Sequence, residues 1–389
     1  MSMQNSNSSA APSWPLLTGV SVVGVYAHFL LHAESQIAVL GLAVGAILLL
    51  IAFSRFGWTA RVATSAATYP KLLGAGAVAA VVLVAAVSYE MHFALLMLTT
   101  VLLYSTVCLG LNIQFGYSGV VNFAGAAFFG IGSYTAAVLA SHSPLPHLLI
   151  VALAGLVAAL LGSLLILPVL RTRGHYAALI TIAFGILFKT FLEVNDALGG
   201  PQGLKIPGME ILGWKFNDNI AIGDHELSFY LNYLVLSLAL CAVTFVLVRR
   251  LERSWMGLSM DVVRLDETAA ATFGVDIARW KITAFTLGNG LAGMAGAIYG
   301  MMTGFVAPNN FTFGDSLILV SIVILGGIGN PWGILPAAAI VLILPEKLQF
   351  IQEYRFLLYA LLVILILLFR PDGLLPRKIR NYFPGDAGR

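Results

Sequence analysis

The residues able to do chemistry are sparse, and the first candidate is the tetrapeptide Gly116-Tyr117-Ser118-Gly119. A serine between glycines in an apolar segment is the pattern of an intramembrane serine protease. Such a nucleophile needs a base within hydrogen-bond reach at the same depth. Every histidine after Ser118 lies in an expected loop or at the end of an apolar run, and none follows His225. The sequence therefore argues against a protease.

The sequence also lacks the residues that metal binding and nucleotide binding require. No histidine pairs with acids at metal-ligand spacing. Cys108 and Cys241 each lie inside an apolar run, which is typical of small packing residues. The chain has no G-x-x-x-x-G-K-[ST] phosphate loop. We therefore predict no catalytic residue, no metal site and no cofactor, and any ATP must be hydrolysed by another protein.

Charged residues gather in the loop 249–281. Six of the 21 Lys and Arg residues lie here, between two apolar runs. A loop with this charge is expected on the cytoplasmic side of a membrane. Within it, Ser259 can cap a helix from Met260 to Phe273, Asp266 offers an alternative cap for a shorter helix, and Gly274 is a natural stop. We predict a helix that lies along the membrane surface.

This helix would present a face that mixes apolar with charged side chains. An amphipathic helix lying on lipid is the ordinary interpretation, but acidic residues suit an anionic lipid surface poorly. A groove in a partner protein suits such a face better. We therefore predict a docking element. Its candidate contact residues are Val263, Arg264, Asp266, Glu267, Phe273 and Gly274.

The elements that must position these residues are membrane helices. The 389 residues are 59% hydrophobic and 10% charged, with a mean hydropathy of +0.91, whereas a soluble domain carries about 25% charged residues. A helix needs about 20 residues to cross the hydrocarbon core. We predict an all-α, polytopic membrane protein with about twelve transmembrane or partly broken helices. The apolar runs lie near 15–31, 37–53, 72–88, 92–111, 119–140, 148–170, 176–192, 229–248, 282–304, 316–327, 331–344 and 356–369, and those within 316–344 are short enough to be re-entrant.

Loop charge decides the orientation. With the amino terminus inside, 16 Lys and Arg residues lie inside and 5 lie outside or near a membrane end. The opposite orientation reverses this bias, so we predict that both termini are cytoplasmic. The basic residues lie between apolar runs rather than in a surface stripe, which argues against nucleic acid as a partner. The expected surroundings of most of the chain are the lipid bilayer.

Polar content divides the chain near residue 88. The runs before it are plain Ala-, Val- and Leu-rich segments, whereas those after it contain glycines and polar residues. We predict amino-terminal accessory spans over 1–88, a working core over 89–375 that contains the loop 249–281, and a cytoplasmic tail over 376–389.

A polar, Gly-containing break lies at 112–119 between two apolar runs. Tight packing of small residues explains most glycines here and beyond. The functional interpretation is a broken helix whose amide ends face a polar cavity. An unpaired polar side chain in hydrocarbon is costly, so polar residues of the core should face protein or a cavity, with hydrogen bonding between helices as the alternative for each. The candidate solute path comprises Asn112, Tyr117, Ser118, Asn122, Tyr134, Asn289 and Thr303.

Four stretches in a fixed order carry a family resemblance. They are 264–281 continuing into 291–299, 117–119 with 126–136, 171–176 leading to 199–203, and 311–313 with 326–333. Together they resemble the permeases of branched-chain amino acid ABC transporters, M-type, over residues 90 to 375. Two departures stand out. Leu258 and Asp261 occupy places where the family carries further basic residues, and Ala124-Gly125 occupies a place where Gly-His is common.

The resemblance implies a multi-pass permease subunit of an ATP-driven importer in a bacterial inner or plasma membrane, with no enzyme activity of its own. Its implied partners are a second permease subunit, two cytoplasmic ATPase subunits and an external solute-binding protein. The implied cargo is a branched-chain amino acid or a related small polar solute. Two other classes stay open: an ion-coupled secondary transporter, which would need an intramembrane acid, and a passive channel, which leaves the docking element unexplained.

Overall fold

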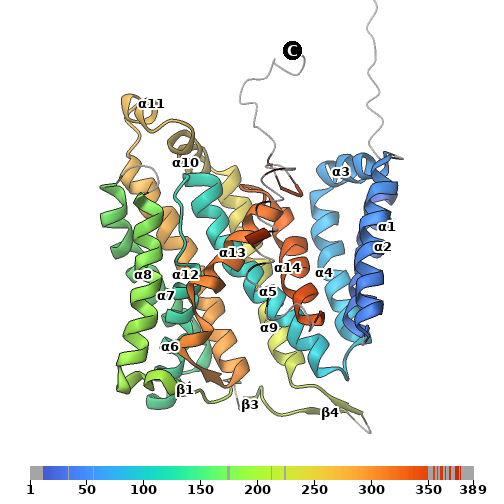
Figure 1. The fold of residues 1–389 in the computed structure, drawn as a ribbon, viewed down its shortest axis with the longest axis horizontal. Helices are drawn as coiled ribbons and strands as arrows, with labels where there is room; N and C mark the ends of the chain where they lie inside the picture. Colours follow the sequence, from blue (N-terminus) through green and yellow to red (C-terminus); the bar gives the residue numbers. More distant parts are fainter. Residues whose placement is uncertain are drawn as a thin grey trace, which may run out of the picture. The chain divides into compact units, whose positions relative to one another are not determined.

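The computed structural model describes residues 12–33, 35–55, 57–172, 176–211, 213–222 and 225–348, and beyond these 354, 357, 360–361, 364, 368, 373–375 and 377. Over these residues the chain is helical apart from three short pairs of strands (Figure 1). Seven helices of this part are long and apolar enough to cross a membrane. The chain is therefore an all-α, polytopic membrane protein.

Two compact units make up the chain. One contains Met1–Leu98 and Ile343–Gln352, and the other contains Thr99–Leu342 and Glu353–Arg389. The first unit holds α1 (Trp14–His32), α2 (Gln36–Arg55), α3 (Trp58–Thr68), α4 (Pro70–Val87) and the start of α5 (His92–Asn112).

A lysine closes one end of the first unit. Lys347 Nζ donates to the carbonyl oxygens of Leu31 at 2.6 Å and Ala33 at 3.1 Å, and it lies 4.8 Å from the centre of the Phe93 ring. The last carbonyls of a helix carry a partial negative charge. The ammonium group therefore stabilises the end of α1.

The second unit contains the remaining helices. They are α6 (Gly125–His142), α7 (His147–Leu170), α8 (Tyr176–Val194), α9 (Tyr230–Arg253), α10 (Trp255–Leu265), α11 (Glu267–Thr272), α12 (Ile277–Thr303), α13 (Phe313–Gly326) and α14 (Ile334–Lys347), whose end belongs to the first unit. Single turns add η1 (Ile113–Ser118), which is π-helical, and the 3₁₀ turns η2 (Asp196–Leu198), η3 (Gly200–Gln202), η4 (Pro308–Asn310) and η5 (Pro331–Gly333).

These helices agree with the predicted apolar runs as far as residue 344, since each run contains a helix. The run 356–369 lies largely outside the described residues, so the number of twelve crossings stays a prediction. α13 and α14 have 14 residues each. At 1.5 Å per residue such a helix is about 21 Å long, which is shorter than the ~30 Å hydrocarbon core.

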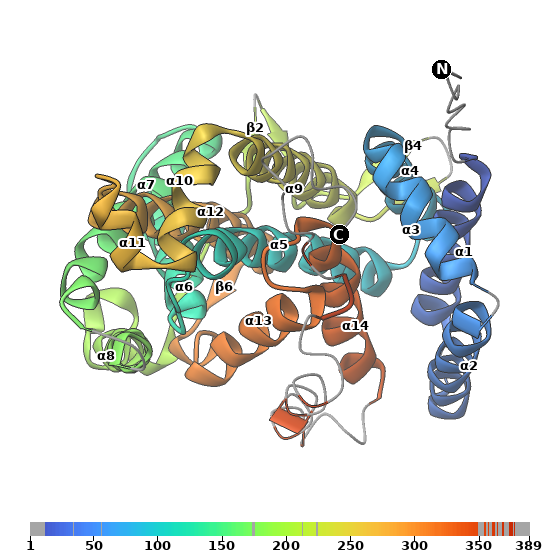
Figure 2. The same ribbon diagram turned by 90° about the horizontal axis from the view of Figure 1, so that it is seen from above.

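The core of the second unit is the contact of α12 with α6 and α7, which lie side by side (Figure 2). A Cβ atom added at Gly132 of α6 would overlap the carbonyl oxygen of Gly293 on α12, and one at Gly296 would overlap that of Phe129. Ser133 Oγ also donates to the Gly296 oxygen at 2.7 Å. Small residues let membrane helices approach this closely. Tight packing therefore accounts for these glycines, as the sequence predicts.

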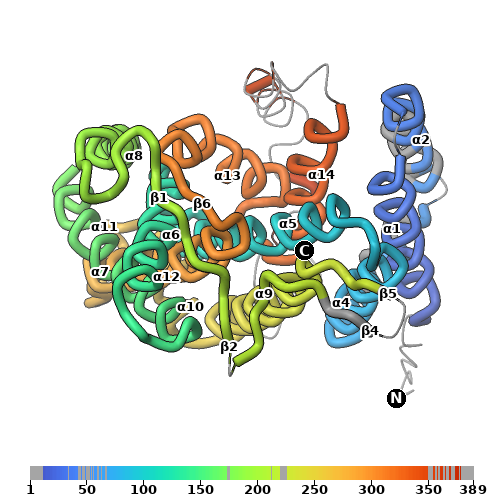
Figure 3. The backbone as a smooth tube through the Cα atoms, turned by 90° about the horizontal axis from the view of Figure 1, so that it is seen from below, coloured from blue at the N-terminus to red at the C-terminus, as the bar shows by residue number. Residues whose placement is uncertain are grey.

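Short strands join loops at the end of this unit opposite α10 and α11. They are β1 (Leu204–Lys205), β2 (Glu210–Ile211), β3 (Trp214–Lys215), β4 (Ile220–Ile222), β5 (His225–Leu227) and β6 (Phe305–Val306). β1 pairs with β6, β2 with β3 and β4 with β5, all antiparallel. The β1–β6 pair ties the segment after α8 to the end of α12 (Figure 3).

Candidate functional site

The loop 249–281 forms two short helices, α10 and α11, instead of one. Ser254 caps α10 and accepts a hydrogen bond from the Gly257 N–H at 3.3 Å. The predicted start at Met260 with Ser259 as cap is wrong, because Ser259 lies within α10 and its hydroxyl donates to the Trp255 carbonyl at 3.1 Å.

The alternative cap, Asp266, is confirmed. Its carboxylate accepts from the Thr268 and Ala269 N–H groups at 2.8 and 3.0 Å, which begins α11. Gly274 follows the end of α11 with φ of +75°, a conformation that glycine adopts without strain. Each break in the loop is thus fixed by a cap or a glycine.

The predicted contact residues lie on two different sides of this loop. Val263 is 1% exposed and packs inside the protein, so it is not part of the outer surface. Leu265 and Phe273 are 75% and 83% exposed. Glu267 pairs with Lys281 at 2.6 Å. The outer surface therefore combines two apolar side chains with an ion pair and the exposed Arg264, Asp266 and Gly274.

Helix α10 packs directly against the break that follows α5. Gly119 has φ of +70° and ends η1, and a Cβ atom there would lie 3.1 Å from Arg264 Cγ. Residues 119–124 lie outside any helix, and α6 begins at Gly125. The loop 249–281 is therefore in contact with the place where the membrane helix is interrupted.

Three buried amides, Gln114, Asn122 and Asn289, form a cluster at this break. Gln114 Nε2 donates to Asn289 Oδ1 at 3.1 Å and to the Phe285 carbonyl at 3.2 Å. Asn122 Nδ2 donates to Gln114 Oε1 at 2.8 Å and to Asn289 Oδ1 at 3.0 Å. All three residues are at most 1% exposed. The amide cluster thus consists of hydrogen bonds between helix segments far apart in the sequence.

The backbone N–H groups at the start of α6 are hydrogen-bonded to side chains and do not open onto a polar cavity. The N–H of Phe123 donates to Thr181 Oγ1, and that of Ala126 donates to Ser316 Oγ, both at 3.1 Å. The N–H of Ala124 donates to Asn122 Oδ1 at 2.8 Å. The interpretation of a broken helix with open amide ends is wrong at these positions, because side chains from α8, α13 and the break itself accept their hydrogen bonds.

The remaining residues of the candidate path separate into two groups. Asn112, Tyr117 and Ser118 lie at the break, where Asn112 Oδ1 accepts from the Gly329 N–H at 2.7 Å and Ser118 donates to the Gln114 carbonyl at 2.9 Å. Tyr134 and Thr303 lie elsewhere. Thr303 is exposed at the end of α12 and donates to the Tyr299 carbonyl at 3.0 Å.

Two residues that were not among the predicted site residues make contacts in this region. Gln114 joins Asn122 to Asn289, and its position in the polar break was the available signal in the sequence. Asp261 is the buried carboxylate of α10, and it receives Arg377 from 116 residues away. No local pattern could indicate that pairing.

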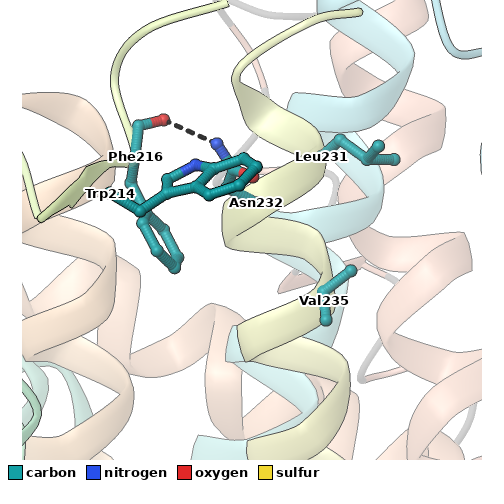
Figure 4. A pocket seen from close by; sticks show the side chains of 5 residues that line it. All are labelled: Trp214, Phe216, Leu231, Asn232 and Val235. Carbon is teal, nitrogen blue, oxygen red and sulfur yellow. Dashed lines mark hydrogen bonds between the residues drawn. The ribbon is translucent and has the colours of Figure 1, made fainter. Parts of the chain in front are cut away.

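A shallow hollow lies at the opposite end of the unit (Figure 4). It has a volume of about 240 Å³ and lies between the β3 segment and α9. Asn232 Nδ2 donates to the Phe216 carbonyl across it at 3.2 Å. Among the described residues its lining is Trp214, Phe216, Leu231, Asn232 and Val235, and none of these carries a charge for recognising a solute.

Comparison with known proteins gives a consistent result. The family model "branched-chain amino acid transport system / permease component" matches residues 93–369. The high-affinity branched-chain amino acid transport system permease protein LivM of Salmonella typhimurium is 35% identical over 293 residues, covering 72% of this chain and 69% of that protein. A probable LivM of Methanocaldococcus jannaschii is 26% identical, covering 71% and 91%. The Escherichia coli permease LivH is 24% identical, covering 70% and 91%.

No solved structure matches the chain. The family match covers most of the chain, including the break after α5, the loop 249–281 and the glycine contacts of α12. LivM of Salmonella typhimurium, at 35% identity, is more similar to the chain than LivH of Escherichia coli, at 24%. The chain is thus a multi-pass membrane protein that belongs to the family of branched-chain amino acid transport system permease components, of the M type.

Proposed function

We propose that this chain is the transmembrane permease subunit of an ATP-driven importer of branched-chain amino acids or related small polar solutes. The observation that carries the proposal is the family match over residues 93–369. Its partners would be a second permease of the LivH kind, two cytoplasmic ATPase subunits and an external solute-binding protein. The chain has no phosphate loop of its own, so ATP hydrolysis belongs to the ATPase subunits.

The ATPase subunits are proposed to dock on the loop 249–281. Leu265 is the exposed last residue of α10, and the exposed Phe273 directly follows α11; caps fix the starts of both helices, which suits a preformed contact. This assignment requires cytoplasmic termini, which the loop charges support. It goes with about twelve crossings. The family match covers residues 93–369, which supports an accessory role for spans 1–88 and a permease core over 89–375, and the tail over 376–389 contributes Arg377 to that core.

The alternatives have less support. A secondary transporter needs an ionisable acid within the membrane, and the acids among the described residues lie in loops, in the loop 249–281 or within the terminal turns of helices. A passive channel needs no docking element, which leaves the exposed Leu265 and Phe273 without a role.

Replacing Phe273 with serine tests the docking assignment. Exposed aromatic anchors at protein interfaces contribute about 2 kcal/mol or more, which is about thirtyfold in affinity. We expect ATPase-subunit retention and ATP-dependent uptake to fall by at least about tenfold, while the permease inserts and folds normally. The measurements are co-purification of the subunits and uptake into vesicles with the complete complex.

Ala271→Ser is the matched control. Ala271 is exposed on the same helix and its replacement adds a hydroxyl without removing an apolar side chain. We expect normal uptake from this control. Normal uptake from Phe273→Ser would place the docking contact elsewhere.

Tyr134 is the candidate that best fits a solute contact. It is buried on α6 with its ring 6.1 Å from that of Phe311, and its hydroxyl has no hydrogen-bond partner among the described residues. Removing an unsatisfied buried hydroxyl should not destabilise the protein. We expect Tyr134→Phe to keep the thermal midpoint and to lower uptake severalfold, and unchanged uptake would remove Tyr134 from the path.

A further inference from the structure

The last described segment of the chain lies across the connection between α13 and α14. The N–H of Leu374 donates to the Leu325 carbonyl at 2.7 Å, and Asn330 Nδ2 donates to the Leu375 carbonyl at 3.0 Å. These contacts hold residues 373–375 against the end of α13 and the segment that follows it. They also fix the position from which Arg377 reaches inward.

Arg377 contacts the break after α5 and the loop 249–281 at once. Its Nη1 donates to the Gly116 carbonyl in η1 at 2.8 Å, and its Nη2 donates to Asp261 Oδ2 in α10 at 2.6 Å. The guanidinium carbon lies 4.8 Å from the centre of the Tyr117 ring. One planar side chain thus joins a carbonyl of the interrupted helix to a carboxylate of the proposed docking element.

The surroundings are built for this side chain. Gly329 has φ of +84°, and a Cβ atom there would lie 2.5 Å from Arg377 Cδ, so the absence of a side chain admits the arginine. Asp261 is 7% exposed and its other oxygen lies 3.8 Å from Arg264 Nε. A buried carboxylate without its partner is strongly disfavoured. Asp261 therefore holds α10 to Arg377.

We propose that Arg377 is a positioning residue that makes α10 and the break after α5 move as one body during transport. The inference rests on the proposed function, because it concerns how docking at α10 reaches the membrane helices. Direct packing of Arg264 on Gly119 brings the two elements together, whereas Arg377 adds directional bonds to both. Lysine could pair with Asp261 but could not also donate to Gly116 and stack on Tyr117, because it lacks the planar fork of donors.

The first test needs only the purified full-length chain in lipid nanodiscs. Hydrogen–deuterium exchange is compared between wild type, Arg377→Gln and Arg377→Lys. We expect faster exchange over 113–119 and 255–265 in Arg377→Gln, a smaller increase in Arg377→Lys, and unchanged exchange in α6 and α12. Wild-type exchange over both segments in Arg377→Gln would overturn the proposal.

The second test measures coupling in the reconstituted complex. We expect Arg377→Gln to reduce the solute imported per ATP hydrolysed by at least about fivefold, a size typical of coupling between sites, with ATPase activity retained. Asp261→Asn should lower the solute imported per ATP by a similar factor. The double variant should lower it no further than either single variant, because all three remove the same Arg377–Asp261 interaction. A normal ratio in Arg377→Gln would overturn the proposal.

Arg61→Gln is the matched control, since it removes the same charge from an exposed position in α3, outside the loop 249–281. It should leave both the exchange and the coupling ratio unchanged. If the wild-type complex shows no ATP-dependent uptake, the proposed function is wrong, whereas the exchange comparison still decides whether Arg377 links the two segments.

Discussion

A Gly132→Ala variant is expected to be markedly less stable than the wild type, although it adds a single methyl group. That methyl would overlap the carbonyl oxygen of Gly293, so α6 and α12 must separate. Overpacking costs about 1–3 kcal/mol when side chains can yield, and a backbone carbonyl yields less than a side chain. We expect a loss near the upper end of that range, which lowers the thermal midpoint of a unit of this size by about 5 °C, at an unfolding entropy of about 2.1 cal/mol/K per residue. Thermal unfolding in detergent measures it.

Gly185→Ala is the matched control for this effect. Gly185 lies within α8, and a Cβ atom there would meet nothing within 4 Å. Because alanine is also the better helix former, this variant should keep the wild-type midpoint. Equal midpoints for the two variants would show that the α6–α12 contact is looser than the glycine spacing indicates.

Replacing Gln114 with methionine should produce the next largest effect. The change keeps the side-chain length but removes the hydrogen bonds to Asn122, Asn289 and the Phe285 carbonyl. A hydrogen bond between membrane helices is worth only ~0.6 kcal/mol on average, but partners left buried and unsatisfied cost about 1–3 kcal/mol. The cost of the unsatisfied partners is the larger of the two contributions, so we expect the thermal midpoint to fall by several degrees.

A triple variant separates a structural from a transport role for the amide cluster. Gln114→Met, Asn122→Ser and Asn289→Leu together remove the mutual partners, while the serine oxygen can still accept from the Ala124 N–H. Replacing all members of a buried network by apolar groups can be nearly neutral. We expect both stability and uptake to recover. Recovered stability without uptake would instead assign these amides to the solute path.

The class of the molecule and its family could be predicted from the amino-acid sequence alone. Composition and the length of the apolar runs required membrane helices, since no soluble core could hide so much apolar surface. Local signals also placed Asp266 as the cap of α11 and Gly274 after its end, because a cap acts over three or four residues. The single helix over 260–273 failed because Ser254 supplies an earlier cap than Ser259.

The tertiary structure alone decided which polar residues meet. Lipid and helix contacts are both apolar, so hydrophobic periodicity does not distinguish the face of a membrane helix that packs on protein. The contacts among Gln114, Asn122 and Asn289 therefore could not be predicted without knowing that α12 lies beside the break after α5. The bond between Asp261 and Arg377 likewise depends on where the chain returns after 116 residues. Capping and hydropathy depend on residues that are near in sequence. The amide cluster and the Asp261–Arg377 bond depend instead on how closely the glycines allow distant helices to pack.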